Sequence, residues 1–244
     1  MPGTRKDHSA YLKLPIFHIP AQWEVTDKEL IVEGVLKDGK LSGTMITPRG
    51  QTLTWVGVPA PSLKRDKAPV WGKPMPLFNG KNLDGWQALG KNQWVAENGV
   101  LKSPASGSNI RTVQTFNDFK LHIEFRYPKE SNSGVYLRGR YEIQIEDNQG
   151  KEPQSVYLGG VYGFIDPWVN AAKAAGEWQS YDVTLIGRMV TVVANGQTII
   201  FKQEIPGITG GAINSDEAAP GPIMLQGDHG PIEYRNIIIT PAKK

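Results

Sequence analysis

The most restrictive feature of this sequence is the strict alternation of residues 119–126, which read FKLHIEFR. Successive side chains of a β-strand point to opposite faces, whereas a helix buries residues three and four positions apart. This segment can gather its four apolar side chains on one face only as a strand, and its polar side chains then share the other face. A chain built from such segments folds by packing sheets against each other.

Further segments with a strand pattern follow at short intervals. Asn195-Gly196 separates two of them and supplies the positive φ angles of a two-residue hairpin. The 27 glycines and 18 prolines favour turns and disfavour long helices, so that only residues 168–175 predict a helix. We therefore predict an all-β fold of two antiparallel sheets packed face to face. Its further strands are expected at residues 135–138, 141–146, 180–186, 189–194, 197–201, 223–226 and 232–240.

The N-terminal part of the chain predicts a smaller β unit. Asp38-Gly39 turns a hairpin between residues 30–36 and 41–46, and residues 52–58 extend it by a third strand. Five prolines between residues 59 and 76 cannot maintain a ladder of backbone hydrogen bonds. The predicted organisation is a β accessory segment without catalytic groups at residues 1–60, a solvated Pro-rich linker at 61–75 and the main domain at 76–244.

Composition excludes several classes of function. The absence of cysteine excludes a disulfide scaffold, a thiol nucleophile and a Cys-ligated metal site. No apolar run approaches the roughly 20 residues of a membrane helix, so no membrane span is predicted. The net charge is only +3 and the one basic run is Lys64, Arg65 and Lys67, which argues against a nucleic-acid partner. The first residues lack the apolar stretch of a secretory signal, so the chain is either cytoplasmic or written without its leader.

The most concentrated polar face is predicted on residues 141–146. Glu142, Gln144 and Glu146 stand two residues apart, so they project from one face at steps of about 7 Å. A carboxylate that faces a groove can act as a general base, and the spacing resembles the Glu-x-Asp-x-Glu strand of laminarinase-type glycosidases with Gln144 in place of the central acid. Asp147 reaches the same groove only if the strand ends or bulges at Glu146. The alternative is a solvated sheet face with cross-strand ion pairs.

A second polar group stands where a strand runs into a glycine-rich turn, at Gln226, Asp228 and His229. Imidazole can donate and recover a proton near neutral pH, although a single His can also be structural. The four histidines show no metal-binding spacing. No metal site and no cofactor are therefore predicted, and a divalent cation on the loops stays open without a signal for it.

Six motifs, in order and at fitting spacing, resemble one family. They are LFNGKNLDGW at residues 77–86, NSGVYLRG at 132–139, YEIQ at 141–144, GEWQ at 176–179, QGDH at 226–229 and YRNI at 234–237. Together they are similar to the 3-keto-disaccharide hydrolase family over residues 76–241. In the N-terminal part, residues 38–44 resemble the end of an accessory β segment that precedes this domain in some members.

The resemblance implies a concanavalin A-like jelly roll that cleaves 3-keto-glycosides, with a 3-keto-glycoside or oligosaccharide as its partner. Many members are exported, so we expect a periplasmic or extracellular protein whose leader is absent from this chain, with the cytoplasm as the alternative. The sequence carries no signal for an oligomeric state. The expected catalytic residues are Glu142, His229 and Arg138, and the expected substrate-binding residues are Glu124, Gln144, Asp147, Gln226 and Tyr136.

The chemistry of such a substrate fits these residue types. A ketone at C3 acidifies the C2 proton, and its removal gives an enolate that can expel the C1 alkoxide before water adds to the product. We predict Glu142 as the base, Arg138 as the group that holds the enolate oxygen and His229 as the donor to the leaving oxygen. The alternatives are a non-catalytic carbohydrate-binding module on the same sandwich and a structural sandwich without a pocket.

Overall fold

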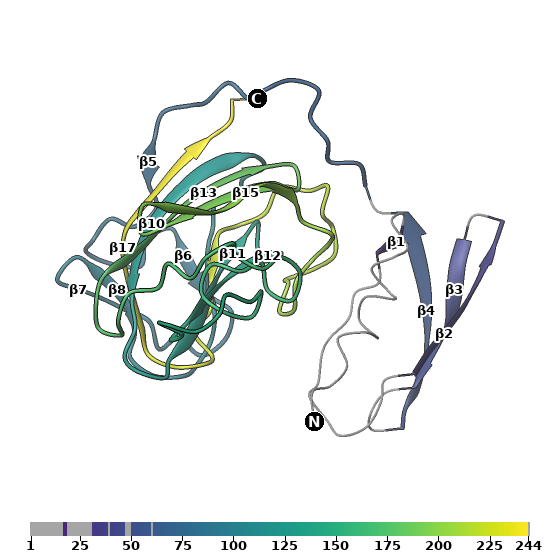
Figure 1. Ribbon diagram of the computed structural model, residues 1–244, viewed down its shortest axis with the longest axis horizontal. Coiled ribbons are helices and arrows are strands. Elements are labelled where there is room, and N and C mark those ends of the chain that lie inside the picture. Colours follow the sequence, from purple (N-terminus) through teal and green to yellow (C-terminus); the bar gives the residue numbers. More distant parts are fainter. Residues whose placement is uncertain (1–16, 19–30, 39, 47–49, 60, 244) are drawn as a thin grey trace. The chain divides into compact units, whose positions relative to one another are not determined.

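The computed structural model describes residues 17–18, 31–38, 40–46, 50–59 and 61–243 (Figure 1). The chain forms two compact units, Met1–Ser62 and Leu63–Lys244. Every described element is a strand or a loop, so no described segment is a helix long and apolar enough to cross a membrane.

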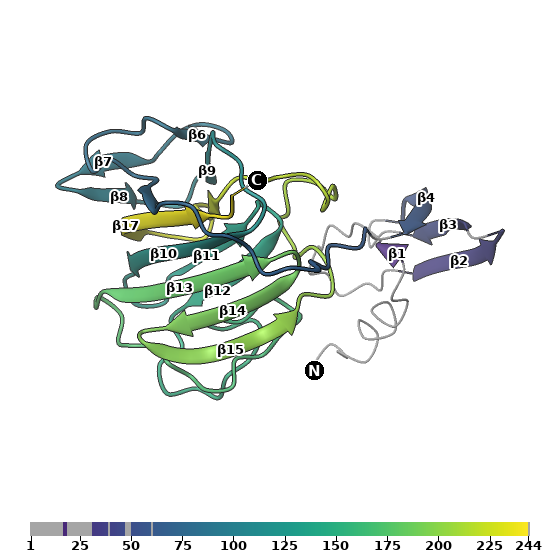
Figure 2. The same ribbon diagram turned by 90° about the horizontal axis from the view of Figure 1, so that it is seen from above.

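Two antiparallel sheets build the larger unit. The eight-stranded sheet has the order β15-β14-β13-β10-β17-β8-β7, with β5 paired to β17, and the five-stranded sheet has the order β12-β11-β16-β9-β6. In Figure 2, β13, β14 and β15 run side by side in the first of these sheets. The strands are β5 (Met75–Pro76), β6 (Trp86–Ala88), β7 (Val95–Glu97), β8 (Val100–Ser103), β9 (Ile110–Thr112), β10 (Phe119–Arg126), β11 (Asn132–Leu137), β12 (Tyr141–Glu146), β13 (Gln179–Ile186), β14 (Met189–Ala194), β15 (Gln197–Glu204), β16 (Met224–Leu225) and β17 (Ile232–Pro241).

The core lies between these sheets and is filled by the apolar side of each alternating strand. Phe119, Leu121 and Ile123 of β10 and Ile143 and Ile145 of β12 are at most 1% exposed and belong to one cluster. Each fully buried side chain of this size stabilises the fold by about 1.5–3 kcal/mol. The predicted all-β sandwich and the predicted register of β12 are confirmed. The predicted 195–196 hairpin is confirmed as well, with positive φ at Asn195 and Gly196.

The smaller unit is a four-stranded antiparallel sheet in the order β1-β4-β3-β2. The predicted hairpin forms, with Asp38 at φ +50°, although Gly39 lies outside the described residues. Gly43 is required where two strands approach closely, because a Cβ there would stand 1.8 Å from the Glu33 carbonyl oxygen. The strands are β1 (Phe17–His18), β2 (Ile31–Lys37), β3 (Lys40–Ile46) and β4 (Thr52–Pro59).

The helix predicted for residues 168–175 is wrong, because this segment is a loop. Its backbone donors are taken by distant acceptors: the Trp168 N–H bonds the Ile199 carbonyl at 2.9 Å and the Lys173 N–H bonds Gln179 Oε1 at 3.0 Å. Asn170 adds a local turn by accepting the Ala172 N–H at 2.9 Å. Tertiary hydrogen bonds and an Asn side chain thus replace the bonds that a helix would make within itself.

The predicted solvated linker is also partly wrong, because several of its residues pack on the sandwich. Leu63 is buried, and Arg65 donates to both carboxylate oxygens of Asp118 at 2.7 and 3.1 Å. The Gly72 N–H bonds the Pro241 carbonyl at 2.8 Å. Lys64 and Lys67 are exposed as expected. The prolines prevent a ladder, but a buried leucine and a bidentate ion pair still hold the segment.

Candidate active site

The outer face of the five-stranded sheet, on the side away from the core, carries the predicted polar strand. Val135 and Ile143 pair with each other and both point into the core, so the residues on either side of them point outward. The register makes three outward pairs across β11 and β12, which are Tyr136 with Glu142, Gly134 with Gln144, and Asn132 with Glu146.

This face extends on both sides of β11 and β12. On one side the Gln226 N–H bonds the Gly134 carbonyl at 2.9 Å, which sets Gln226 beside Gly134. On the other side a loop segment adds to the free edge of β12, where Val161 bridges Ile143 and the Tyr162 N–H bonds the Glu142 carbonyl at 3.1 Å. Glu142 therefore lies in one row between Tyr162 and Tyr136.

Glu142 is a buried carboxyl group, only 3% exposed. Burial raises the pKa of Glu142 to about 8; a hydrogen bond with Tyr136 lowers this pKa in part, and the charge of Asp228 raises it further. Its side chain occupies the space over Gly134, because a Cβ at that position would stand 2.2 Å from Glu142 Oε1. A carboxyl group with this pKa can take or give a proton near neutral pH.

A short loop lies against this face beside the β11–β12 turn, where the Thr209 N–H bonds the Arg140 carbonyl at 2.9 Å. The Tyr136 hydroxyl donates to the Gly210 carbonyl at 3.0 Å, and Thr209 Oγ1 accepts the Glu142 N–H at 3.0 Å. Gly211 lies beside the ring at φ +75°, and a Cβ there would stand 2.5 Å from the Tyr136 hydroxyl oxygen. Gly211 thus lets the backbone approach the phenol.

Two amide groups on this face have an unused acceptor. Gln144 Oε1 and Gln226 Oε1 are both buried, and neither accepts a hydrogen bond from any residue that the structure describes. The Gln144 amide nitrogen is used, since it donates to the Val156 carbonyl at 3.3 Å. A buried acceptor without a donor costs free energy, so these oxygens call for donors from water or a ligand. Hydroxyl groups of a sugar are donors of this kind.

His229 lies on the loop after β16 and is about half exposed. Its Nδ1 is 2.7 Å from Asp228 Oδ1, which leaves Nε2 directed to a ligand or solvent. The loop is anchored, because the Gly107 N–H bonds the Gly227 carbonyl at 2.7 Å. Burial raises the pKa of Glu146, and the charge of His229 lowers it in part, which places this imidazole near the second carboxylate of the face.

The structure does not bring Arg138 to this face, contrary to the prediction. Arg138 is fully buried, and its guanidinium donates to the Tyr141 hydroxyl at 3.0 Å and to the Gly187 carbonyl at 2.9 Å. The cause is local: Arg138 follows the last residue of β11 at φ +53°, so the alternation of the strand no longer fixes its direction. It supports the turn between β11 and β12.

Glu124 is also absent from this face, contrary to the prediction. It lies on the outer face of the eight-stranded sheet, on the other side of the core, where it accepts hydrogen bonds from Arg235 Nε at 2.6 Å and Asn236 Nδ2 at 2.8 Å. Asp147 follows the end of β12 and accepts the Glu130 N–H at 2.9 Å. The alternation of β10 correctly predicts that Glu124 points away from the core, but it does not predict which sheet β10 joins.

Three residues of this face were missed: Tyr162, Thr209 and Asn132. Asn132 Nδ2 donates a hydrogen bond to Glu146. Its place on this face could have been predicted, because it stands two residues before Gly134 on the same strand and therefore points to the same side. Tyr162 and Thr209 lie in loops, where no periodicity exists to reveal them. No group of three or more His, Asp or Glu side chains that could hold a metal ion occurs in the part of the chain that the structure describes.

Comparison with known proteins gives the context of this site. A 3-keto-disaccharide hydrolase from Bacteroides thetaiotaomicron is 27% identical over 31% of this chain and 30% of its own length, so the matched part spans less than a third of that relative. Among solved structures, a candidate glycosyl hydrolase from Parabacteroides distasonis is 31% identical with a TM-score of 0.57, covering 68% of this chain and 82% of that one. A second from the same organism is 25% identical with a TM-score of 0.56, covering 69% and 98%.

The family comparison covers most of the sandwich. The family described as the 3-keto-alpha-glucoside-1,2-lyase-like domain matches residues 73–240, which run from just before β5 to the penultimate residue of β17. This match includes β11, β12 and the loop of His229, and therefore the whole polar face described above. The chain belongs to the 3-keto-alpha-glucoside-1,2-lyase-like domain family.

Proposed function

We propose that this protein cleaves glycosides whose sugar carries a ketone at C3, by removing the C2 proton and eliminating the C1 substituent. The observation that carries the proposal is Glu142, a buried carboxyl group with a pKa of about 8 on the polar face of a domain of this family. Support for a glycoside-cleaving role comes from the relatives named above. Glu142 is the more deeply buried of the two glutamates on this face, and this reaction requires only one base.

The ketone makes proton abstraction feasible. The C2 proton lies next to the carbonyl carbon, so its removal leaves a negative charge that the C3 oxygen shares. The electron pair then forms the C1–C2 double bond as the C1–O bond breaks. A plain glycoside lacks this acidity and requires two carboxyl groups for displacement or water activation. Gln144, which stands where laminarinase-type enzymes have an acid, is compatible with the elimination.

The raised pKa of Glu142 suits the role of base. A base works best when its pKa lies near the working pH, because it then combines strength with a sufficient ionised fraction. When Glu142 has taken the proton, it can donate to the Tyr136 hydroxyl oxygen while that hydroxyl donates to the Gly210 carbonyl. When Glu142 is ionised, the same hydroxyl can donate to it. Tyr136 thus serves both states of the base.

The remaining polar groups fit the substrate and the leaving group. Gln144 Oε1 and Gln226 Oε1 are two buried acceptors on either side of Gly134, suited to hydroxyl groups of the sugar. His229, oriented by Asp228 at 2.7 Å, can give a proton through Nε2 to the departing oxygen. Water then adds to the unsaturated product, and the net outcome is hydrolysis.

The test compares two substrates that differ only at C3. The protein is incubated with 4-nitrophenyl 3-keto-glucoside and with the unoxidised parent, and release of nitrophenol is followed. We expect release from the keto substrate alone. Equal release from both would show an ordinary glycosidase. Saturable binding of the keto substrate without any release would instead show a carbohydrate-binding module.

A further inference from the structure

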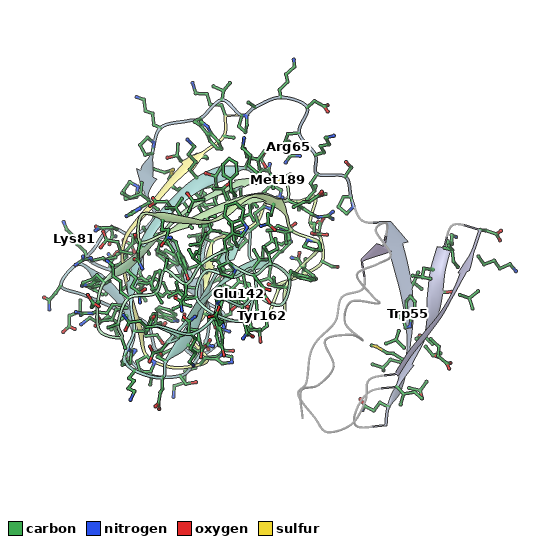
Figure 3. All side chains as sticks on the ribbon, viewed as in Figure 1. Trp55, Arg65, Lys81, Glu142, Tyr162 and Met189 are labelled. Carbon is green, nitrogen blue, oxygen red and sulfur yellow. The ribbon has the colours of Figure 1, made fainter. Side chains whose placement is uncertain are left out.

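Tyr162 is the outward neighbour of Glu142 on the segment that covers the edge of β12. The two residues are joined by the Tyr162 N–H to the Glu142 carbonyl at 3.1 Å, and Figure 3 shows their side chains in neighbouring positions. Glu142 is 3% exposed, whereas Tyr162 is 37% exposed. Tyr162 is therefore the most exposed member of this row.

The segment that carries Tyr162 is fixed in place. The Gln144 N–H bonds the Gly160 carbonyl and the Gly159 N–H bonds the Gln144 carbonyl, both at 2.9 Å. Gly159 has φ +83°, and a Cβ there would stand 2.1 Å from Ile199 Cδ1, so only glycine fits. Val161, the residue before Tyr162, is fully buried in the core. A side chain mounted in this way has its position set before a ligand binds.

The Tyr162 hydroxyl is a hydrogen-bond donor that a ligand can use. It makes no hydrogen bond with any residue in the described part of the chain, whereas the Tyr136 hydroxyl donates to Gly210. Burial raises the pKa of Tyr162, and the charges of Glu142 and Glu146 raise it further. The phenol therefore keeps its proton at neutral pH.

We propose that Tyr162 is a catalytic residue that donates a hydrogen bond to the C3 oxygen of the substrate while Glu142 removes the C2 proton. This inference rests on the proposed function. The reaction needs a donor at that oxygen, and Arg138, the residue expected from the sequence, is sealed in the β11–β12 turn. Tyr162 is the exposed donor beside the base.

The step balances without any further reagent. The C2 proton passes to the Glu142 carboxylate, the C–H electron pair forms the C2–C3 double bond, and the carbonyl pair moves to the C3 oxygen, which the Tyr162 O–H stabilises. The carbonyl then re-forms, the C2–C3 pair moves to C1–C2, and the C1–O bond breaks with its electrons on the leaving oxygen. Donors held where charge develops lower the barrier most.

The test isolates proton abstraction from elimination. The analogue 1,5-anhydro-3-keto-glucitol has no aglycone at C1, so exchange of its C2 proton in D₂O, followed by NMR, reports enolate formation without release of an aglycone. Wild type, Tyr162→Phe and Tyr157→Phe are compared in this exchange and in the cleavage of 4-nitrophenyl 3-keto-glucoside. Tyr157 is a matched control, because it lies in the same loop with its ring beside Lys151. The phenylalanine variant retains the ring of Tyr162 and removes only the hydroxyl.

We expect Tyr162→Phe to lower both rates by roughly 10² to 10³, the usual loss for one oxyanion donor, and Tyr157→Phe to keep wild-type rates. Wild-type rates in Tyr162→Phe would overturn the role of Tyr162 alone. Loss of cleavage with normal exchange would also overturn it, since the hydroxyl would then act on the leaving group. A wild-type protein that neither exchanges nor cleaves would overturn the proposed function itself.

Discussion

The two outer faces of the sandwich differ in how their polar side chains are paired. On the eight-stranded sheet, Glu124 binds Arg235 and Asn236, and Arg126 is paired with Glu233. On the five-stranded sheet, Glu142 is buried with no cationic partner among the described residues, and the Gln144 and Gln226 amide oxygens have no donor there. Paired charges at an accessible surface stabilise little and do no chemistry, whereas a desolvated carboxyl group has a shifted pKa. The face with unsatisfied groups is the one that can act on a ligand.

The largest expected effect is on catalytic activity, and only a change on the face of the five-stranded sheet should produce it. Glu142→Gln should lower kcat/KM for a 3-keto-glucoside by roughly 10² to 10⁴, because the amide cannot accept the C2 proton. Glu124→Gln, the matched change on the opposite face, should leave kcat/KM at the wild-type value. Steady-state kinetics on both variants checks this. Equal losses in the two variants would mean that the faces do not differ in function.

The next effect concerns the leaving group. His229→Ala should lower kcat by roughly 10² for a 3-keto-glucoside with an alkyl aglycone, which needs a proton to depart. The 4-nitrophenyl aglycone leaves without help and should lose much less. The measurement is the ratio of the two rates in the variant and in wild type. An unchanged ratio would remove His229 from this role.

A smaller effect is the pH dependence of kcat/KM. For the 4-nitrophenyl substrate, which does not need a proton from His229, only the base limits the profile. Because Glu142 must be ionised to act as this base and its pKa is about 8, kcat/KM should rise about tenfold per pH unit below pH 8 and level off above it. Asp228→Asn removes the negative charge that raises this pKa, so the midpoint should move to lower pH. A pH–rate profile between pH 5 and 10 gives both midpoints. A midpoint near pH 4.5 in wild type would contradict the desolvated environment.

The smallest expected effect is on the stability of the fold, and its sign differs between the carboxyl groups of the two faces. Burial raises the pKa of Glu142 above its value in the unfolded chain, so the folded state binds the proton more tightly, and ionisation destabilises the fold between about pH 4.5 and pH 8. Glu142→Gln should therefore gain stability over wild type, on the order of a few kcal/mol, as pH rises through that window.

Glu124 should show the opposite sign. Burial raises its pKa, but the hydrogen bonds from Asn236 and Arg235 outweigh burial, so the net shift is downward. Its ion pair then stabilises the fold above the unfolded pKa, and this contribution is lost as pH falls through the folded value. Glu124→Gln should thus be slightly less stable than wild type at pH 7 and equal to it at acid pH. Urea titrations at pH 3, 5, 7 and 8 check both variants.

The sequence predicted the strands well because burial imposes a period of two on each of them. The buried positions of Ile143 and Ile145 and the outward positions of Glu142 and Gln144 followed from parity alone. Parity does not say which sheet a strand joins, so it could not correct the expectation from the resemblance that Glu124 lies on the same face as Glu142. The alternation also holds only within a strand. Arg138 follows the end of β11 at positive φ and points inward, and Tyr162 lies in a loop, where no alternation predicts the direction of a side chain.

The segment that carries Tyr162 has a consequence for engineering the domain. Hydrogen bonds from Gly159, Tyr162 and Gln144 occupy the edge of β12 that faces away from β11. An open edge of this kind is a template on which other chains can add strands and aggregate. Shortening the loop to admit bulkier sugars would therefore expose backbone donors and acceptors as well as widen the site. Substrate range and solubility are linked here, and variants that change side chains while keeping the loop backbone are the safer route.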